Sequence, residues 1–161
     1  MAPDNAWGII QGLETAPLRM KQHCSNAEKV VTFLNKHKNV ERVIYPTLHE
    51  GELAARAKKY FKGGNGALVG IEVKGGVEAG KKFIEALKMF YHVANIGDAR
   101  SLAIHPATTT HSQLTPEELL AAGVTPGYIR LSIGIEHPDD IIADLEQALN
   151  ASGKPGLKAV S

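Results

Sequence analysis

The residue best suited to chemistry in this chain of 161 residues is Arg130, in the segment Tyr128–Glu136. Every second residue of this segment is apolar: Ile129, Leu131, Ile133 and Ile135. A period of two predicts a β-strand with one apolar and one polar face, and Arg130 falls on the polar face. An arginine held on a sheet is a rigid fork suited to the two oxygens of one carboxylate or phosphate. The alternative is a structural ion pair with Glu136, Asp98 or Glu72.

A second group of polar residues lies between Ala94 and Ser112. Donors and acceptors gather there beside apolar residues, at Asn95, Gly97, Ser101, Thr108, Thr109, Thr110 and His111. Polar side chains on irregular backbone are common at ligand sites, but Asn and Thr also satisfy local backbone groups in ordinary turns. His105 and His111 lack an orienting carboxylate nearby in the sequence, so we expect both to be structural rather than catalytic.

Composition excludes several classes of function. With 43% hydrophobic residues, 22% charged residues and a net charge of +1, the chain has the make-up of an ordinary globular domain. Scattered lysines argue against nucleic-acid binding, and no apolar run is long enough to span a membrane. The single cysteine, Cys24, fits a reducing compartment such as the cytoplasm. No histidine or cysteine pair has metal-ligand spacing, and Ser132 lacks the glycine setting of a serine hydrolase.

The elements that must position Arg130 follow from periodicity. Apolar residues at helical spacing predict a long helix over residues 1–36, which Pro17 should bend or divide. Strands are expected at Val40–Tyr45, Ala67–Lys74 and His92–Ile96, besides the one that carries Arg130. Further helices are expected at Glu52–Tyr60, Val77–Met89, Thr115–Ala121 and Asp139–Leu149. Thr115 and Glu118 form a capping box, and Ser101–His111 is expected to be an irregular loop.

This pattern predicts an α+β fold, an α/β sandwich in which helices cover one face of a small, mostly antiparallel sheet. We expect a long interdomain-type helix over residues 1–36, a substrate-binding α/β domain over 37–150 and a flexible tail over 151–161. The sheet face that carries Arg130 would be left bare in an isolated chain. The long first helix would expose apolar side chains, and such a surface favours self-association.

Four stretches resemble one known family. PDNAWGIIQGLETAPLRMKQHCSNAEKV is similar to a long helix that joins two domains, and KGGVEAGKKFIEAL, HPATTTH and IRLSIGIEHPDDIIADLEQAL continue the match over almost the whole chain. Together they resemble the C-terminal domain of the Cys/Met-metabolism pyridoxal-phosphate enzymes, which have the fold-type I architecture. The segment NIGDARSLAIHPATTTHSQL is most similar to the O-acetylhomoserine sulfhydrylase branch of that family.

The resemblance implies roles for three residues. In the family, the arginine at the position of Arg130 binds the substrate α-carboxylate. The side chain or backbone at the position of Asn95 contacts the same carboxylate, and the threonine matching Thr110 lines this region. The family role of Arg130 agrees with the independent interpretation of an arginine on the polar face of a strand.

The resemblance also indicates what is missing. The family holds pyridoxal 5′-phosphate on a lysine of a Ser-x-Thr-Lys motif, and no lysine of this chain follows such a motif. We therefore expect a truncated chain with no catalytic, cofactor-binding or metal-binding residues of its own, which does not bind the cofactor covalently and is inactive alone. Its missing partner is the N-terminal pyridoxal-phosphate domain.

For the full-length parent, the resemblance implies a transferase of methionine biosynthesis and cysteine metabolism. It would replace the acetate of O-acetylhomoserine by sulfide or a thiol, giving homocysteine or methionine, as a cytoplasmic homotetramer without nucleic-acid or membrane partners. One alternative is the C-terminal domain of a cystathionine γ-synthase or γ-lyase type of enzyme. The other is a stand-alone, non-catalytic binding domain.

Overall fold

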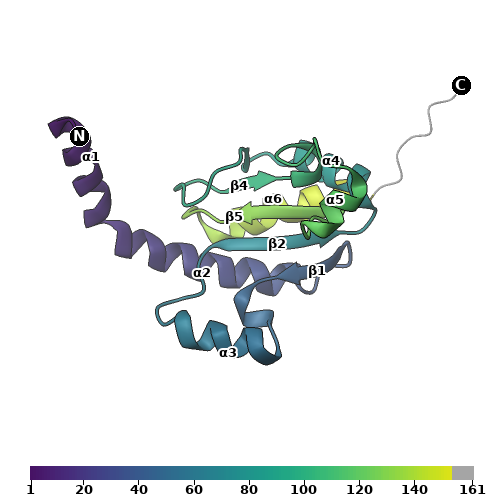
Figure 1. Ribbon diagram of the computed structural model, residues 1–161, viewed down its shortest axis with the longest axis horizontal. Helices are drawn as coiled ribbons and strands as arrows, with labels where there is room; N and C mark the ends of the chain where they lie inside the picture. The colour runs from purple at the N-terminus through teal and green to yellow at the C-terminus, as the bar shows by residue number, and fades with distance from the viewer. Residues whose placement is uncertain (154–161) are drawn as a thin grey trace, which may run out of the picture.

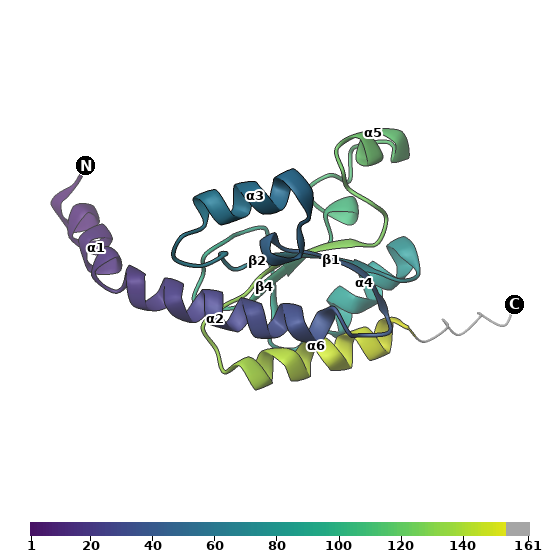
Figure 2. The same ribbon diagram turned by 90° about the horizontal axis from the view of Figure 1, so that it is seen from below.

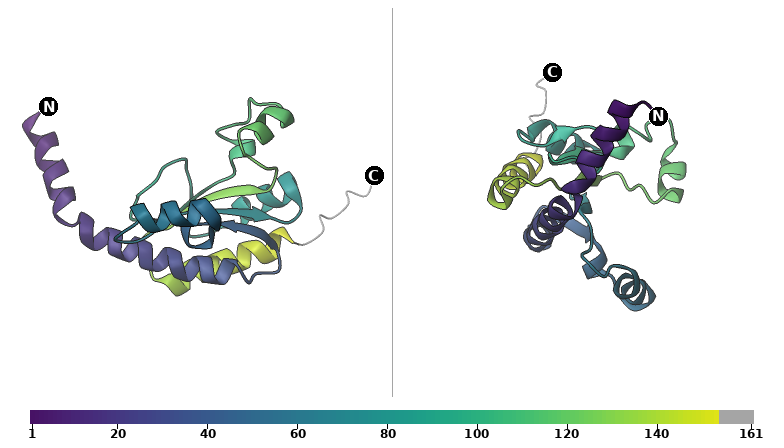
Figure 3. Two further views of the ribbon diagram at one scale, coloured as in Figure 1. Left: turned by 60° about the horizontal axis from the view of Figure 1, so that its bottom comes forward. Right: turned by 90° about the vertical axis from the view of Figure 1, so that its left-hand side faces the viewer.

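The computed structural model describes residues 1–153, and its N-terminal arm consists of two helices. Helix α1 (Pro3–Glu14) and helix α2 (Ala16–Leu34) meet at Thr15, with Pro17 in the first turn of α2. The predicted division of the long helix at Pro17 is confirmed, because a proline fits the first turn of a new helix but not a helix interior. Helix α1 buries no residue and leaves the body of the domain at an angle to α2 (Figure 3).

The sheet has five strands in the order β1-β2-β5-β4-β3, which places β5 at its centre (Figure 1). All pairings are antiparallel except the short parallel pair of β3 and β4. The prediction of a mostly antiparallel sheet is therefore confirmed. The strands are β1 (Val40–Ile44), β2 (Leu68–Val73), β3 (Tyr91–His92), β4 (Leu102–Ile104) and β5 (Tyr128–Ser132).

One face of the sheet carries the hydrophobic core. Helices α2, α4 (Gly76–Ala86) and α6 (Pro138–Ser152) cover this face (Figure 2). Side chains of β5 such as Ile129 and Leu131 are fully buried there with Phe83 of α4 and Leu145 of α6. Each such side chain contributes about 1.5–3 kcal/mol through removal from water. The apolar half of the alternating strand thus fixes which way Arg130 faces.

The opposite face of the sheet is only flanked by helices. Helix α3 (Gly51–Tyr60) packs on the short helix η1 (Pro46–Leu48), and α5 (Pro116–Ala121) stands off the sheet on the same side (Figure 2). Neither α3 nor α5 buries a residue. The predicted capping box at the start of α5 is present, with the Thr115 and Glu118 side chains bonding each other's backbone N–H groups.

Two expectations for the middle of the chain are wrong. The segment 101–111 is not irregular, because it contains strand β4 and the short helix η2 (Pro106–Thr108). Strand β4 lies between β5 and β3, and all three of its residues are buried. A strand covered on both faces shows no polar alternation, so periodicity does not reveal it. The third strand, expected at 92–96, is limited to Tyr91–His92.

Helix α4 ends at Ala86, three residues before the expected end, because a carboxylate from α6 binds the backbone that follows. Asp144 accepts hydrogen bonds from the N–H groups of Lys88, Met89 and Phe90, at 2.9–3.3 Å. These N–H groups cannot at the same time continue the helical ladder. The arrangement joins α4 to α6 beneath the sheet and holds the chain that leads into β3.

The C-terminal helix α6 begins one residue before the expected start and runs to Ser152. The first residues of the predicted tail over 151–161 are therefore helical, and residues 154–161 lie outside the described residues. Among residues 1–153, none of the helices combines the length and hydrophobicity needed to traverse a lipid bilayer.

Candidate functional site

Arg130 lies in the middle of the central strand, on the face opposite the core. It pairs with Gly70 of β2 on one side and with Ile104 of β4 on the other. Gly70 leaves room for a neighbour, since a Cβ there would lie 2.8 Å from the Tyr128 ring. The Tyr128 ring therefore lies across Gly70, beside the Arg130 side chain. Burial raises the pKa of Tyr128, and the Arg130 charge opposes that rise.

The three carboxylates that could pair with Arg130 are all engaged elsewhere. Glu72 pairs with Arg42 at 2.7 Å, and Asp98 accepts the backbone N–H of Arg100 at 3.0 Å. Glu136 binds Ser101 through both carboxylate oxygens. Across residues 1–153, no carboxylate lies within ion-pair distance of Arg130. The alternative of a structural ion pair is therefore not what the structure shows, and the guanidinium keeps donors for a ligand.

The loop between β3 and β4 lies over Arg130. The Arg130 Nη2 group donates to the backbone carbonyl of Asn95 at 3.2 Å, and the Asn95 side chain accepts from the N–H of Ile96 instead. Two residues on, the N–H of Gly97 donates to the Ser132 hydroxyl at 3.3 Å. Asn95 therefore meets Arg130 through its backbone, while its side chain shapes the loop.

Thr110 is the one predicted site residue for which the described residues show no hydrogen-bond link to Arg130. It lies in the exposed turn after η2, where its hydroxyl is 2.8 Å from Nδ1 of His111. In the part of the chain that the structure describes, Arg130 donates to the Asn95 carbonyl and not to Thr110. Its predicted role in lining the site stays a prediction.

An apolar cavity of about 560 Å³ opens at the end of β5, next to Ser132, and Arg130 is not among its lining residues. Ser132, on the same face of β5, and the loop residues Ile96 and Gly97 form the wall nearest Arg130, and Met20 and Phe61 lie among the other lining residues. No pattern in the sequence predicts that these residues form one group. A signal was available for Ser132, because residues two apart on a strand share a face. No such signal exists for Met20 and Phe61, which come from separate elements.

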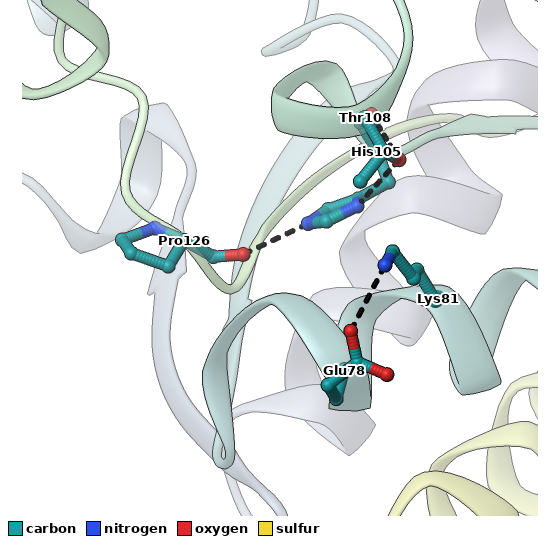
Figure 4. A network of polar contacts seen from close by, with 5 residues as sticks. All are labelled: Glu78, Lys81, His105, Thr108 and Pro126. Atoms are coloured by element: carbon teal, nitrogen blue, oxygen red, sulfur yellow. Dashed lines mark hydrogen bonds and ion pairs between the residues drawn. The ribbon is translucent and has the colours of Figure 1, made fainter. Parts of the chain in front are cut away.

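His105 is fully buried behind this region and is held on both ring nitrogens (Figure 4). Nε2 donates to the carbonyl of Pro126 at 2.8 Å, and Nδ1 of the neutral ring accepts from the Thr108 hydroxyl at 2.9 Å. Gly80 of α4 faces the ring, where a Cβ would come within 2.6 Å of Nε2. His105 is therefore structural, as expected, and ties η2 to the loop before β5.

The buried His105 makes the stability of the fold sensitive to pH. Burial lowers the pKa of His105 from its ordinary value of 6.5, the hydrogen bond to the Pro126 carbonyl opposes this shift, and the charges of Lys81 and His92 lower the pKa further. Below pH 6.5 the unfolded chain then binds more protons than the folded chain. The free energy of unfolding should fall as the pH drops from 6.5 towards the lowered folded pKa. Urea unfolding at a series of pH values from about 7.5 down to about 5 should show this loss of unfolding free energy.

The variant His105→Asn tests the assignment, because it removes one titrating group. Its unfolding free energy should depend less on pH than that of the wild type, whatever its absolute stability. Burial also lowers the pKa of His37. The variant His37→Asn should therefore remove a separate part of the dependence of the unfolding free energy on pH. If the unfolding free energy of His105→Asn depended on pH as strongly as that of the wild type, the buried imidazole of His105 would not be a source of the pH dependence.

Comparison with known proteins gives one family. The family described as Cys/Met metabolism PLP-dependent enzyme matches residues 1–150. An O-acetyl-L-homoserine sulfhydrylase of Leptospira meyeri is 59% identical over 150 residues, which cover 92% of this chain and 34% of that protein. An L-methionine gamma-lyase of Fusobacterium nucleatum subsp. polymorphum is 49% identical over 152 residues, covering 92% of this chain and 38% of that protein.

A solved structure of similar sequence and fold indicates the same family as these relatives. A Campylobacter jejuni protein described as an O-acetylhomoserine (thiol)-lyase, solved with an N′-pyridoxyl-lysine-5′-monophosphate, has a TM-score of 0.85 and 48% identity. The match covers 93% of this chain and 36% of that chain. The α+β fold described above is thus that of one domain in a larger relative. The chain spans about a third of the length of the curated relatives it matches.

Proposed function

Because this chain belongs to the family of Cys/Met metabolism PLP-dependent enzymes, we propose that it forms the substrate-carboxylate side of an O-acetyl-L-homoserine sulfhydrylase. The observation that carries the proposal is Arg130, which stands on the open face of the central strand with no carboxylate partner in residues 1–153. The 59% identity to a sulfhydrylase favours this branch of the family. The overall reaction would be the replacement of acetate by sulfide, giving homocysteine.

The residues around Arg130 do not fit pyridoxal phosphate by themselves. The cofactor requires a lysine for its aldehyde and several donors for its phosphate. No lysine lines the cavity next to Ser132 among the described residues, and its polar side chains are His23, Asn65 and Ser132. When bound, the cofactor supplies an electron sink for the chemistry at the amino acid. The part assigned to this chain is confined to binding and orientation.

Arg130 would bind the α-carboxylate of the amino acid through donors that the Asn95 carbonyl leaves free. A bidentate guanidinium fixes the plane of a carboxylate as well as its position. The chain would then hold the α-carboxylate in one plane without taking part in bond making. Such orientation is worth a large factor in rate when it selects a reactive geometry.

A chimera tests the proposal directly. Residues 1–150 of this chain would replace the matching segment of the Leptospira meyeri sulfhydrylase, to which they are 59% identical. The chimera should form homocysteine from O-acetyl-L-homoserine and sulfide, as followed by thiol-specific detection of the product. A folded chimera that contains pyridoxal phosphate but gives no turnover would contradict the proposed function.

The chain alone should carry no cofactor and no activity. Mixing it with pyridoxal phosphate, reducing with borohydride and measuring peptide masses should give no stoichiometric adduct at any one lysine. The Leptospira meyeri sulfhydrylase under the same treatment is the positive control. A stoichiometric adduct at a single lysine, or turnover of O-acetylhomoserine by the chain alone, would contradict the proposal that this chain binds the substrate carboxylate but not the cofactor.

A second candidate is γ-elimination from a sulfur amino acid, which the 49% identity to an L-methionine gamma-lyase favours. The same chimera distinguishes the two. Release of a thiol and a 2-oxo acid from methionine, without added sulfide, would favour the lyase. For the protein to which this segment corresponds we also propose a tetramer in the cytoplasm, on the basis of the family resemblance and the single cysteine.

A further inference from the structure

We infer that Glu136 is a positioning residue, which fixes the loop over Arg130 by binding Ser101 at the end of that loop. Ser101 is fully buried, although the ten residues before it are all exposed. Its backbone N–H donates to Oε1 of Glu136 at 2.7 Å, and its hydroxyl donates to Oε2 at 2.9 Å. One carboxylate thus holds both donors of one residue.

The other contacts of Ser101 and Glu136 tie three segments together. The Ser101 hydroxyl accepts the N–H of Gly134 at 2.9 Å, and Asn26 of α2 donates to the carbonyls of Gly134 and Glu136 at 3.0 and 2.8 Å. We call Asn26, Ser101, Gly134 and Glu136 the Ser101 anchor. It joins α2, the end of β5 and the end of the β3–β4 loop.

Gly134 is required for this arrangement. A Cβ at Gly134 would collide with the Glu136 carboxylate and would lie 2.5 Å from the carbonyl of Ala99. The N–H of Ile135 also donates to that carbonyl, at 2.9 Å. The loop therefore runs directly against the backbone that follows β5, with no side chain between them. Such close contact transmits the position of one segment to the other.

The anchor acts on the site through the loop itself. The exposed loop contacts β5 at Asn95, whose carbonyl accepts from Arg130, and at Gly97, whose N–H donates to Ser132. Both bonds, at 3.2 and 3.3 Å, are long. The shorter bonds of the anchor therefore hold the loop, and the longer ones follow its position. Releasing Glu136 should move the carbonyl that orients Arg130.

Trypsin cleavage gives a direct measure of the anchor in the full chain. The bond after Arg100 is the one whose amide N–H is held by Glu136, so cleavage there requires the anchor to open. The variant Glu136→Gln replaces one acceptor oxygen by a donor and leaves one Ser101 donor unpaired. It should increase the rate of cleavage after Arg100 about tenfold or more, since local opening then requires less free energy.

Two comparisons separate local opening from general loss of structure. Cleavage after Arg130, in the central strand, reports global unfolding and should change much less than cleavage after Arg100. Glu72→Gln is the matched control, because Glu72 pairs with Arg42 on the same sheet but is not part of the anchor. Ser101→Ala provides a second variant and should also speed cleavage after Arg100. Equal cleavage in wild type and Glu136→Gln would overturn the inference.

The second readout concerns substrate and rests on the proposed function. Titration of the chain with O-acetyl-L-homoserine should shift the NMR signal of the Gly97 amide, and the methyl ester of the ligand should not. Glu136→Gln should weaken this binding about tenfold, with Glu72→Gln unchanged. Faster cleavage with unchanged binding would make the anchor structural only and overturn its positioning role. If the wild type shows no carboxylate-dependent shift, both the carboxylate site and the substrate role of Glu136 are overturned. Cleavage would still decide whether the anchor holds the loop.

Discussion

Replacing Arg130 by methionine in the chimera should weaken substrate binding by about 2–5 kcal/mol, or about 30-fold to several thousand-fold. Methionine keeps an apolar chain of similar length but removes the charge and the paired donors. The loss should appear in the KM for O-acetyl-L-homoserine, because the carboxylate is held in the ground state as well as during the reaction. Steady-state kinetics with saturating sulfide measures it.

Two control variants make the Arg130 result interpretable. Arg130→Lys retains the charge without the planar fork, so its defect should be smaller than that of methionine but clearly present. Arg42→Met removes a cation from the same face of the sheet that already pairs with Glu72, and it should leave the KM near the wild-type value. An Arg130→Met chimera with an unchanged KM would exclude Arg130 as the carboxylate ligand.

Replacing Asp144 by alanine should destabilise the fold by about 3 kcal/mol, the largest effect on stability that we expect from a polar side chain. The carboxylate of Asp144 is buried, and its removal leaves the N–H groups of Lys88, Met89 and Phe90 without their acceptor. Urea unfolding of the chain at neutral pH, followed by circular dichroism, measures the change in free energy.

Asp139 is the matched control for Asp144 on the same helix. It is exposed in the first turn of α6, so Asp139→Ala should cost only about 0.3–1 kcal/mol through the helix dipole. Asp144→Asn should fall between the two, because its amide oxygen can still accept while its NH₂ group cannot. Equal stability of Asp144→Ala and Asp139→Ala would show that the hydrogen bonds from the three N–H groups contribute nothing net.

The elements with clear periodicity were predictable from the sequence. The alternation around Arg130 gave both the central strand and the face on which the arginine lies, since its apolar neighbours Ile129 and Leu131 are fully buried. Pro17 likewise marked the boundary between α1 and α2. Strand β4 was missed because it is covered on both faces, and the early end of α4 was missed because it depends on Asp144, 58 residues beyond Ala86 in the chain.

The candidate site was predictable only in part. Arg130 and Asn95 were singled out and do meet, although through the Asn95 backbone rather than its side chain. The sequence also offered Glu136, Asp98 and Glu72 as partners for Arg130, and nothing local showed that each had a different partner. Pairings such as Glu136 with Ser101, across 35 residues, follow from the register of β4 against β5. Register is a tertiary property, which a single sequence does not display.

The open face around Arg130 has a stereochemical consequence. To distinguish the two mirror forms of an amino acid, a protein must contact at least three of the groups on its α-carbon. Arg130 and the adjoining loop approach a ligand from the sheet side alone and address a single group, the carboxylate. The chain alone should therefore bind D- and L-O-acetylhomoserine equally well, so that the choice of enantiomer belongs to the surface that faces Arg130 across the substrate.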